Sequence, residues 1–223
     1  MADHSVRDPE VQPPFAHQFD DLQQQHESTN LGMWTFLVTE IMFFGGLFIA
    51  YLIYRMSYPH AFAEASHELN IFWGGLNTVI LLCSSLTMAL AVAAAQEGNN
   101  KVTAFFLTLT LVLGAAFLGI KGIEYTHKFH EHLVPGSGFH MEGARDVHVQ
   151  MFFCLYFAMT GMHAVHMIIG AGALITLIVM CMSNRFSREY NSPVELTGLY
   201  WHFVDIIWIF LFPLLYLIGR HAS

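Results

Sequence analysis

Five long apolar runs constrain this chain more than any other feature of its sequence. They cover residues 31–54, 71–95, 102–123, 149–182 and 196–218. A helix that crosses the hydrocarbon core of a bilayer needs roughly 20 apolar residues, whereas a strand of a membrane barrel needs about 10 residues of alternating polarity. Because the runs are longer than such strands and continuously apolar, the sequence predicts an all-α integral membrane protein with a bundle of five transmembrane helices.

Composition agrees with a membrane protein and limits the partners. Of the 223 residues, 55% are hydrophobic and only 12% are charged, whereas a soluble domain carries about 25% charged residues. The net charge of -8 argues against nucleic acid as a partner. Residues 1–30 are polar and lack the apolar core of a secretory signal, so we expect a polar N-terminal arm followed by a membrane domain over residues 31–223.

The first apolar run contains a glutamate, in the segment "LVTEIMFFGG". A charge at the centre of a membrane helix costs roughly 2.5–3.5 kcal/mol on insertion scales, so such a residue normally faces the interior of a bundle and has a partner there. We therefore expect Glu40 to face other helices and not the lipid tails. The lysines and arginines divide almost evenly between the two ends of the predicted helices, so charge alone does not orient the chain.

Further ionisable residues lie in the fourth and fifth runs. In "TGMHAVHMIIG", His163, His166 and Gly170 recur at helical spacing and share one face, where the glycine would let another helix approach closely. In "YWHFVDIIW", His202 and Asp205 are neighbours on a helix face. A neutral imidazole that donates to a carboxylate satisfies both groups, so we interpret His202 and Asp205 as a structural pair.

Two groups of histidines raise the question of a metal. His163 and His166 supply only two ligands from one helix, which is too few for a metal site of their own. The segment "HKFHEHLVPGSGFH" is richer, with four possible ligands close together: His127, His130, Glu131 and His132. Such a group could bind zinc or copper. Extramembrane histidines in a histidine-rich chain are more often solvated, so we predict no metal site and no catalytic residue.

Four segments together resemble one family, subunit III of the haem-copper respiratory oxidases (cytochrome c oxidase). In chain order they are "LGMWTFLVTEIMFFGGLFIAY", "LNTVILLCSSLT", "TGMHAVHMIIG" and "YWHFVDIIWIFLFPLLYL". The similarity extends from Leu31 to Gly219. Mitochondrial members of the family have seven spans, and this chain resembles the short bacterial form with five helices.

The resemblance implies a non-redox accessory subunit of a proton-pumping oxidase that reduces oxygen to water. It would pack against subunit I, share the complex with subunit II, bind phospholipid, and sustain proton uptake and turnover. Haem and copper would lie in the partner subunits and none in this chain. Glu40 and His166 would contact lipid head groups, and His163, His202 and Asp205 belong to the same signature. The family implies a bacterial inner (plasma) membrane location with a cytoplasmic N-terminus, and leaves membership of a larger respiratory supercomplex open.

Other interpretations stay open at this point. Within the superfamily, the chain could be the third subunit of a quinol oxidase or an accessory subunit of a nitric oxide reductase. A membrane cytochrome would need haem held between His163 or His166 and His202. A proton-coupled transporter built around Glu40 would be expected to show an internal repeat, and none is evident.

Overall fold

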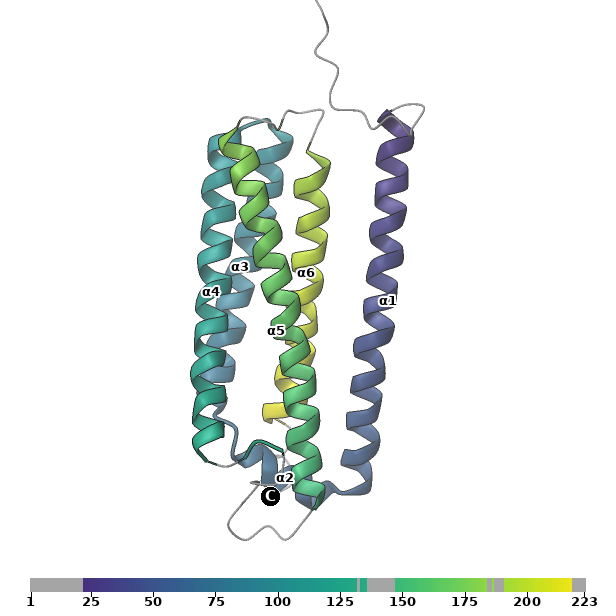
Figure 1. Cartoon of the computed structure of the whole chain (residues 1–223), viewed down its shortest axis with the longest axis vertical. Coiled ribbons are helices and arrows are strands. Elements are labelled where there is room, and N and C mark those ends of the chain that lie inside the picture. Colours follow the sequence, from purple (N-terminus) through teal and green to yellow (C-terminus); the bar gives the residue numbers. More distant parts are fainter. Residues whose placement is uncertain (1–21, 132, 136–146, 184–185, 187–190, 218–223) are drawn as a thin grey trace, which may run out of the picture.

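The structure, a computed structural model, describes residues 22–131, 133–135, 147–183, 186 and 191–217. Its elements in chain order are α1 (Leu22–Ser57), α2 (Pro59–His67), α3 (Ile71–Gln96), α4 (Asn100–His130), α5 (Val147–Met182), α6 (Ser192–Phe212) and the π-helix η1 (Pro213–Leu217). None of the residues described forms a strand. The all-α prediction is therefore confirmed (Figure 1).

The five predicted spans are also confirmed. Within the residues described, five helical segments are long and apolar enough to cross a membrane. Four of them contain a predicted run in full, and the last covers the fifth run as far as Leu217. Two helices extend further than predicted. α1 begins at Leu22, so residues 22–30 of the predicted arm are helical. α4 continues to His130, seven residues beyond the end of the third predicted run at residue 123.

The short helix α2 lies between the first two predicted runs and was not predicted. Proline is well suited to the first turn of a helix, where its missing N–H would have no partner, and Pro59 opens α2 in this way. The buried ring of Phe62 packs edge-to-face on Tyr51 of α1 and Phe152 of α5, with both centroid distances 5.4 Å. α2 therefore covers one end of the bundle.

Helices α3, α4, α5 and α6 form the packed part of the bundle, and α1 stands to one side (Figure 1). The buried Trp201 of α6 marks the centre of the packed part. A Cβ atom added at Gly114 of α4 or Gly170 of α5 would lie 2.9 Å from its ring. The close approach predicted at Gly170 is therefore confirmed. In α1, only 17% of the most apolar window is buried, against 56% in the last span.

The helical hydrogen-bond pattern changes at Pro213. Proline has no N–H to offer the Ile209 carbonyl, and the α-helix gives way there to the π-helix η1. The change leaves Tyr216 fully buried and directed toward α4. The Leu214 carbonyl accepts a hydrogen bond from the Tyr51 hydroxyl of α1 at 2.8 Å. The end of the chain thus ties α1 to the packed helices.

Candidate functional site

Glu40 and His166 form a contact between α1 and α5. The Oε2 atom of Glu40 lies 3.0 Å from Nε2 of His166. The other ring nitrogen, Nδ1, donates to the Met162 carbonyl one turn earlier at 2.9 Å. The Tyr200 hydroxyl of α6 donates to the His166 carbonyl at 3.0 Å. Glu40 therefore faces another helix, as predicted, and its histidine partner is held by α5 and α6.

These contacts fix the number of protons at the pair. A carbonyl only accepts, so Nδ1 of His166 carries a hydrogen. The contact between Nε2 and Glu40 then needs a second hydrogen, which lies on Nε2 or on the carboxyl group. The pair is either an imidazolium beside a carboxylate or a neutral imidazole beside a carboxylic acid. Both forms have one hydrogen in the contact between Nε2 and the carboxyl group, in addition to the hydrogen on Nδ1.

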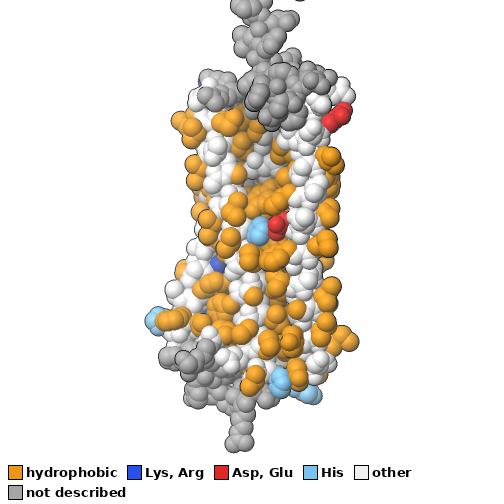
Figure 2. Space-filling model, turned by 45° about the vertical axis from the view of Figure 1, so that its right-hand side comes forward, with side chains coloured by type: hydrophobic (Ala, Val, Ile, Leu, Met, Phe, Trp, Pro, Cys, Tyr) orange, Lys and Arg blue, Asp and Glu red, His pale blue; other side chains and the backbone are white. Residues whose placement is uncertain are grey.

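The pair is not sealed inside the bundle. Its side chains are 20% exposed for Glu40 and 11% exposed for His166. Figure 2 shows an acidic and a histidine side chain side by side at about mid-height, surrounded mainly by hydrophobic side chains. Next to the pair lies an apolar groove of about 250 Å³ between α1, α5 and α6, lined by Met33, Phe36, Ile169, Ala173, Leu196, Thr197 and Tyr200. The pair thus borders a surface suited to a hydrocarbon chain.

His163 does not join this pair. It is fully buried, and its Nε2 donates to the Val204 carbonyl of α6 at 3.1 Å. Its ring packs against Phe117 and Trp208, with centroid distances of 5.4 Å and 5.3 Å. The structure gives His163 the role of a link between α5 and α6.

The predicted pairing of His202 with Asp205 is wrong. Nδ1 of His202 lies 2.7 Å from the Ser85 hydroxyl of α3, which takes the place that the sequence spacing assigned to the carboxylate. Asp205 is buried, and neither of its oxygens meets a hydrogen-bond partner among the residues described. Helical spacing correctly predicts that His202 and Asp205 lie on neighbouring positions of α6. It does not show that Ser85 of the neighbouring helix α3 lies close enough to bind His202 instead.

The structure also reveals a buried polar cluster that the sequence interpretation missed. Lys121 and Glu124 of α4 form an ion pair at 3.0 Å, with side chains only 5% and 7% exposed. The Lys121 ammonium donates to the Tyr216 hydroxyl at 2.7 Å. The hydroxyls of Tyr156 and Tyr216 donate to Oε1 of Glu124 at 2.9 Å and 2.5 Å. These four side chains, from α4, α5 and η1, meet inside the bundle.

The histidines near the end of α4 do not assemble a metal site among the residues described. No group of three or more His, Cys, Asp or Glu side chains in that part of the chain could hold a metal ion. Nδ1 of His127 pairs with Glu131 at 3.0 Å, and the Lys128 ammonium donates to the same carboxylate at 2.7 Å. His132 lies outside the residues described.

Known proteins resemble this chain over most of its length. The family model described as cytochrome c oxidase subunit III matches residues 19–220. A cytochrome c oxidase subunit 3 of Corynebacterium diphtheriae is 31% identical over 191 residues, which is 85% of this chain and 87% of that protein. The corresponding protein of a Synechocystis species is 35% identical, over 84% and 74% of the two chains. A quinol oxidase subunit 3 of Bacillus spizizenii is 30% identical, over 85% and 86%.

Proposed function

Because this chain belongs to the cytochrome c oxidase subunit III family, we propose that it is the non-redox accessory subunit of a haem-copper terminal oxidase. In this proposal it holds phospholipid beside Glu40 and His166, and it sustains proton uptake and turnover of the oxidase. The family makes it one subunit of a multi-subunit oxidase, and its five candidate spans make it a multi-pass membrane protein. In the proposal it packs on subunit I in a bacterial inner membrane, with its N-terminus in the cytoplasm.

The observation that carries the lipid role is the polar pair at the edge of an apolar groove. The groove shares Tyr200 with the pair, since its hydroxyl binds the His166 carbonyl. Phe36 and Ile169 of the groove lie one helical turn from Glu40 and His166. An acyl chain fits such a wall because it can fill the groove and make van der Waals contacts with its apolar side chains. The pair would meet the polar part of the lipid, as the family resemblance implies.

Two features support a role without electron transfer for this chain. Both ring nitrogens of His166 are engaged by protein atoms, and one nitrogen each of His163 and His202 is bonded to a neighbouring helix. The Nε2 atom of His163 binds the Val204 carbonyl of α6. These contacts argue against a haem bridging α5 and α6. In the proposal, haem and copper lie in the partner subunits.

The lipid role is tested with Glu40→Gln in the purified oxidase complex. We expect the haem and copper content to stay unchanged, while the complex loses activity faster during turnover or retains less phospholipid. Glu27→Gln is the matched control, because Glu27 lies on the exposed start of the same helix and accepts a hydrogen bond from Gln23 one turn earlier. Full durability together with full lipid retention in Glu40→Gln would contradict the proposal.

The quinol oxidase relatives favour a second candidate, in which the same subunit serves an oxidase that takes electrons from quinol. The two candidates share the fold, the pair and the groove. Purification through a tag on this chain separates them, because the subunits that accompany it carry the donor site. Activity of the complex with reduced cytochrome c supports the first candidate, and activity with quinol alone supports the second.

A further inference from the structure

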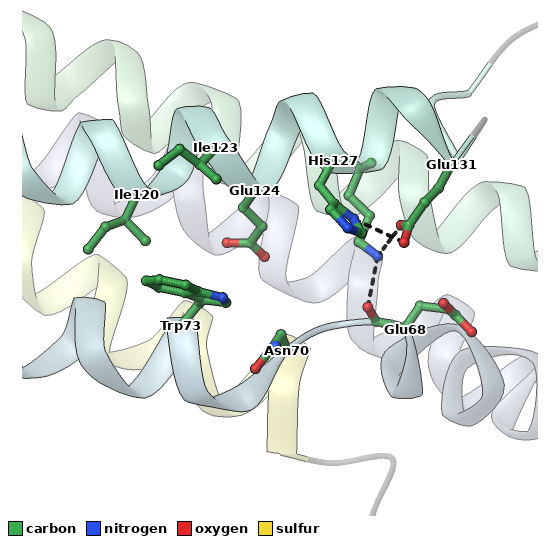
Figure 3. A pocket seen from close by; sticks show the side chains of 9 residues that line it. Glu68, Asn70, Trp73, Ile120, Ile123, Glu124, His127 and Glu131 are labelled. Atoms are coloured by element: carbon green, nitrogen blue, oxygen red, sulfur yellow. Dashed lines mark hydrogen bonds and ion pairs between the residues drawn. The ribbon is translucent and has the colours of Figure 1, made fainter.

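A pocket opens at the end of α4, away from the groove beside Glu40. It has a volume of about 290 Å³ and lies between α3 and α4, with Asn70, Trp73, Ile120, Glu124, Lys128 and Glu131 among its lining residues. We call it the α3–α4 pocket. Figure 3 shows Glu124 and Trp73 facing each other across it from opposite helices. A water molecule occupies about 30 Å³ in the liquid, so the pocket has room for several.

Glu124 connects this pocket to the buried cluster. It lines the pocket, and its carboxylate also accepts hydrogen bonds from Lys121, Tyr156 and Tyr216. A carboxylate offers about four acceptor positions, so three donors leave room for one more partner. A water molecule in the pocket would supply that partner and would join Glu124 to the solution.

The cluster is a costly arrangement for a purely structural role. Replacing a buried ion pair by apolar residues of similar volume is often neutral or even stabilising, because both charges lose their hydration. Ionisable groups at membrane depth therefore point to a function by default. Here a lysine, a glutamate and two tyrosine hydroxyls converge on one point, and one member of the group lines a pocket.

Lys121 has partners that do not depend on the charge of Glu124. Its ammonium donates to the Tyr216 hydroxyl at 2.7 Å and lies 4.7 Å from the Trp208 ring centroid. The rings of Tyr156 and Tyr216 lie 5.4 Å and 5.2 Å from it. Aromatic faces attract a cation electrostatically. The positive charge of Lys121 would therefore stay stabilised if Glu124 became neutral.

From these contacts we propose that Glu124 exchanges a proton with water through the α3–α4 pocket, so that Lys121, Glu124, Tyr156 and Tyr216 form a proton-binding site near one end of the bundle. The proton passes from water in the pocket to a carboxylate oxygen of Glu124. The carboxylate becomes a neutral carboxyl group, and the ion pair changes from net neutral to net positive. The tyrosine hydroxyls, which can donate or accept, turn to suit the protonated carboxyl.

Other titratable groups surround Glu124 from each neighbouring element. On α4 these are Lys121, Tyr125, His127 and Lys128, with Glu131 just beyond the helix, while Glu68, Tyr156 and Tyr216 come from the other segments packed against it. Burial raises the pKa of Glu131, but the hydrogen bond and charge of Lys128 and the nearby His127 outweigh burial and lower it overall. The rim thus presents a carboxylate beside an imidazole, two groups able to pass protons to the pocket.

The proposal is tested by infrared spectroscopy on the purified oxidase complex in lipid. We expect a carboxyl band that grows as the pH falls, shifts in heavy water, and is lost in Glu124→Gln. Ile120→Trp should fill the pocket and slow the heavy-water shift several-fold without changing the cluster. Val112→Trp is the matched control, because Val112 is an exposed position on the same helix and does not line the pocket.

The infrared results either support or overturn the proposed proton-binding site at Glu124. A band that survives Glu124→Gln, or one that exchanges at the wild-type rate in Ile120→Trp, would overturn the proposal. If Glu124→Gln does not assemble, Glu124→Asp replaces it, and a band that keeps its wild-type position in that variant would overturn the proposal. Absence of any glutamate band that titrates also overturns it. The site is separate from the Glu40–His166 pair, so Glu40→Gln should leave the Glu124 band unchanged.

Discussion

Lys121 and Glu124 show how strongly a single side chain can be tied to its partner inside the bundle. In Lys121→Met, the Glu124 carboxylate would stay buried without its cation, so we expect a loss of about 3–5 kcal/mol in the free energy of unfolding. The double variant Lys121→Met with Glu124→Gln should recover most of this loss, because no unpaired charge remains. Thermal unfolding of the purified complex measures both. A double variant no more stable than Lys121→Met would contradict the interpretation.

The Glu40–His166 contact is expected to contribute less to stability than the Lys121–Glu124 ion pair. Its contribution is best measured as a coupling free energy between the two residues. Glu40→Leu and His166→Leu each leave the other side chain without its partner, at a cost of about 1–3 kcal/mol. Because both variants remove the same contact, the double variant should be less destabilised than the sum of the single ones, by about 0.5–3 kcal/mol. Unfolding of all four proteins under one condition gives the coupling. Strict additivity would mean that the contact adds no stability.

Sequence reasoning found Glu40 and missed Glu124 for a physical reason. Glu40 stands alone in a long apolar run, so its cost in the membrane is visible from the sequence. Glu124 lies in "IKGIEYTHKFH", which is polar enough to suggest that the helix has left the membrane. A signal was present, since Lys121, Glu124 and Lys128 recur at helical spacing on one face. Tyr216, the partner of Lys121 and Glu124, lies more than 90 residues further along the chain, which no local pattern shows.

Among the helices, the contact of α5 with α6 depends on the absence of a side chain at Gly170. A methyl group there would lie 2.9 Å from the Trp201 ring and 3.2 Å from Tyr200, so Gly170→Ala should cost about 1–3 kcal/mol of stability through overpacking. Gly172→Ala is the control, because nothing lies within 4 Å of its added Cβ atom. It should be neutral or slightly stabilising, since alanine favours a helix. Equal melting temperatures for the two variants would contradict this explanation.

Helix existence was easier to predict than helix ends. Hydrophobic length identified all five spans, because crossing the bilayer core requires it. The end of α4 was placed too early, since a helix that leaves the membrane can continue as a polar helix to His130. α2 was overlooked because Pro59 begins a helix as readily as it ends one. The π-helix after Pro213 depends on tertiary contacts such as those of Tyr216.

For the molecule as a whole, the packing is asymmetric, with α1 less buried than the other four spans. α3, α4, α5 and α6 bury large aromatic side chains between them, including Trp201 and Trp208. α1 is joined to them chiefly through Glu40, Tyr51 and a few aromatic contacts such as Phe44 with His166. Within the described residues, most of its surface is therefore left for lipid or a partner subunit to cover.

This difference predicts that lipid removal should loosen α1 first. Spin labels at Met42 of α1 and Ile168 of α5, both exposed, would report the distance between the two helices in a background without native cysteines. We expect that distance distribution to broaden when detergent replaces the lipid, because few protein contacts hold α1 in place. Labels at Val79 of α3 and Phe105 of α4 are the control and should keep their distance. A Met42–Ile168 distance unchanged by delipidation would show that protein contacts alone position α1.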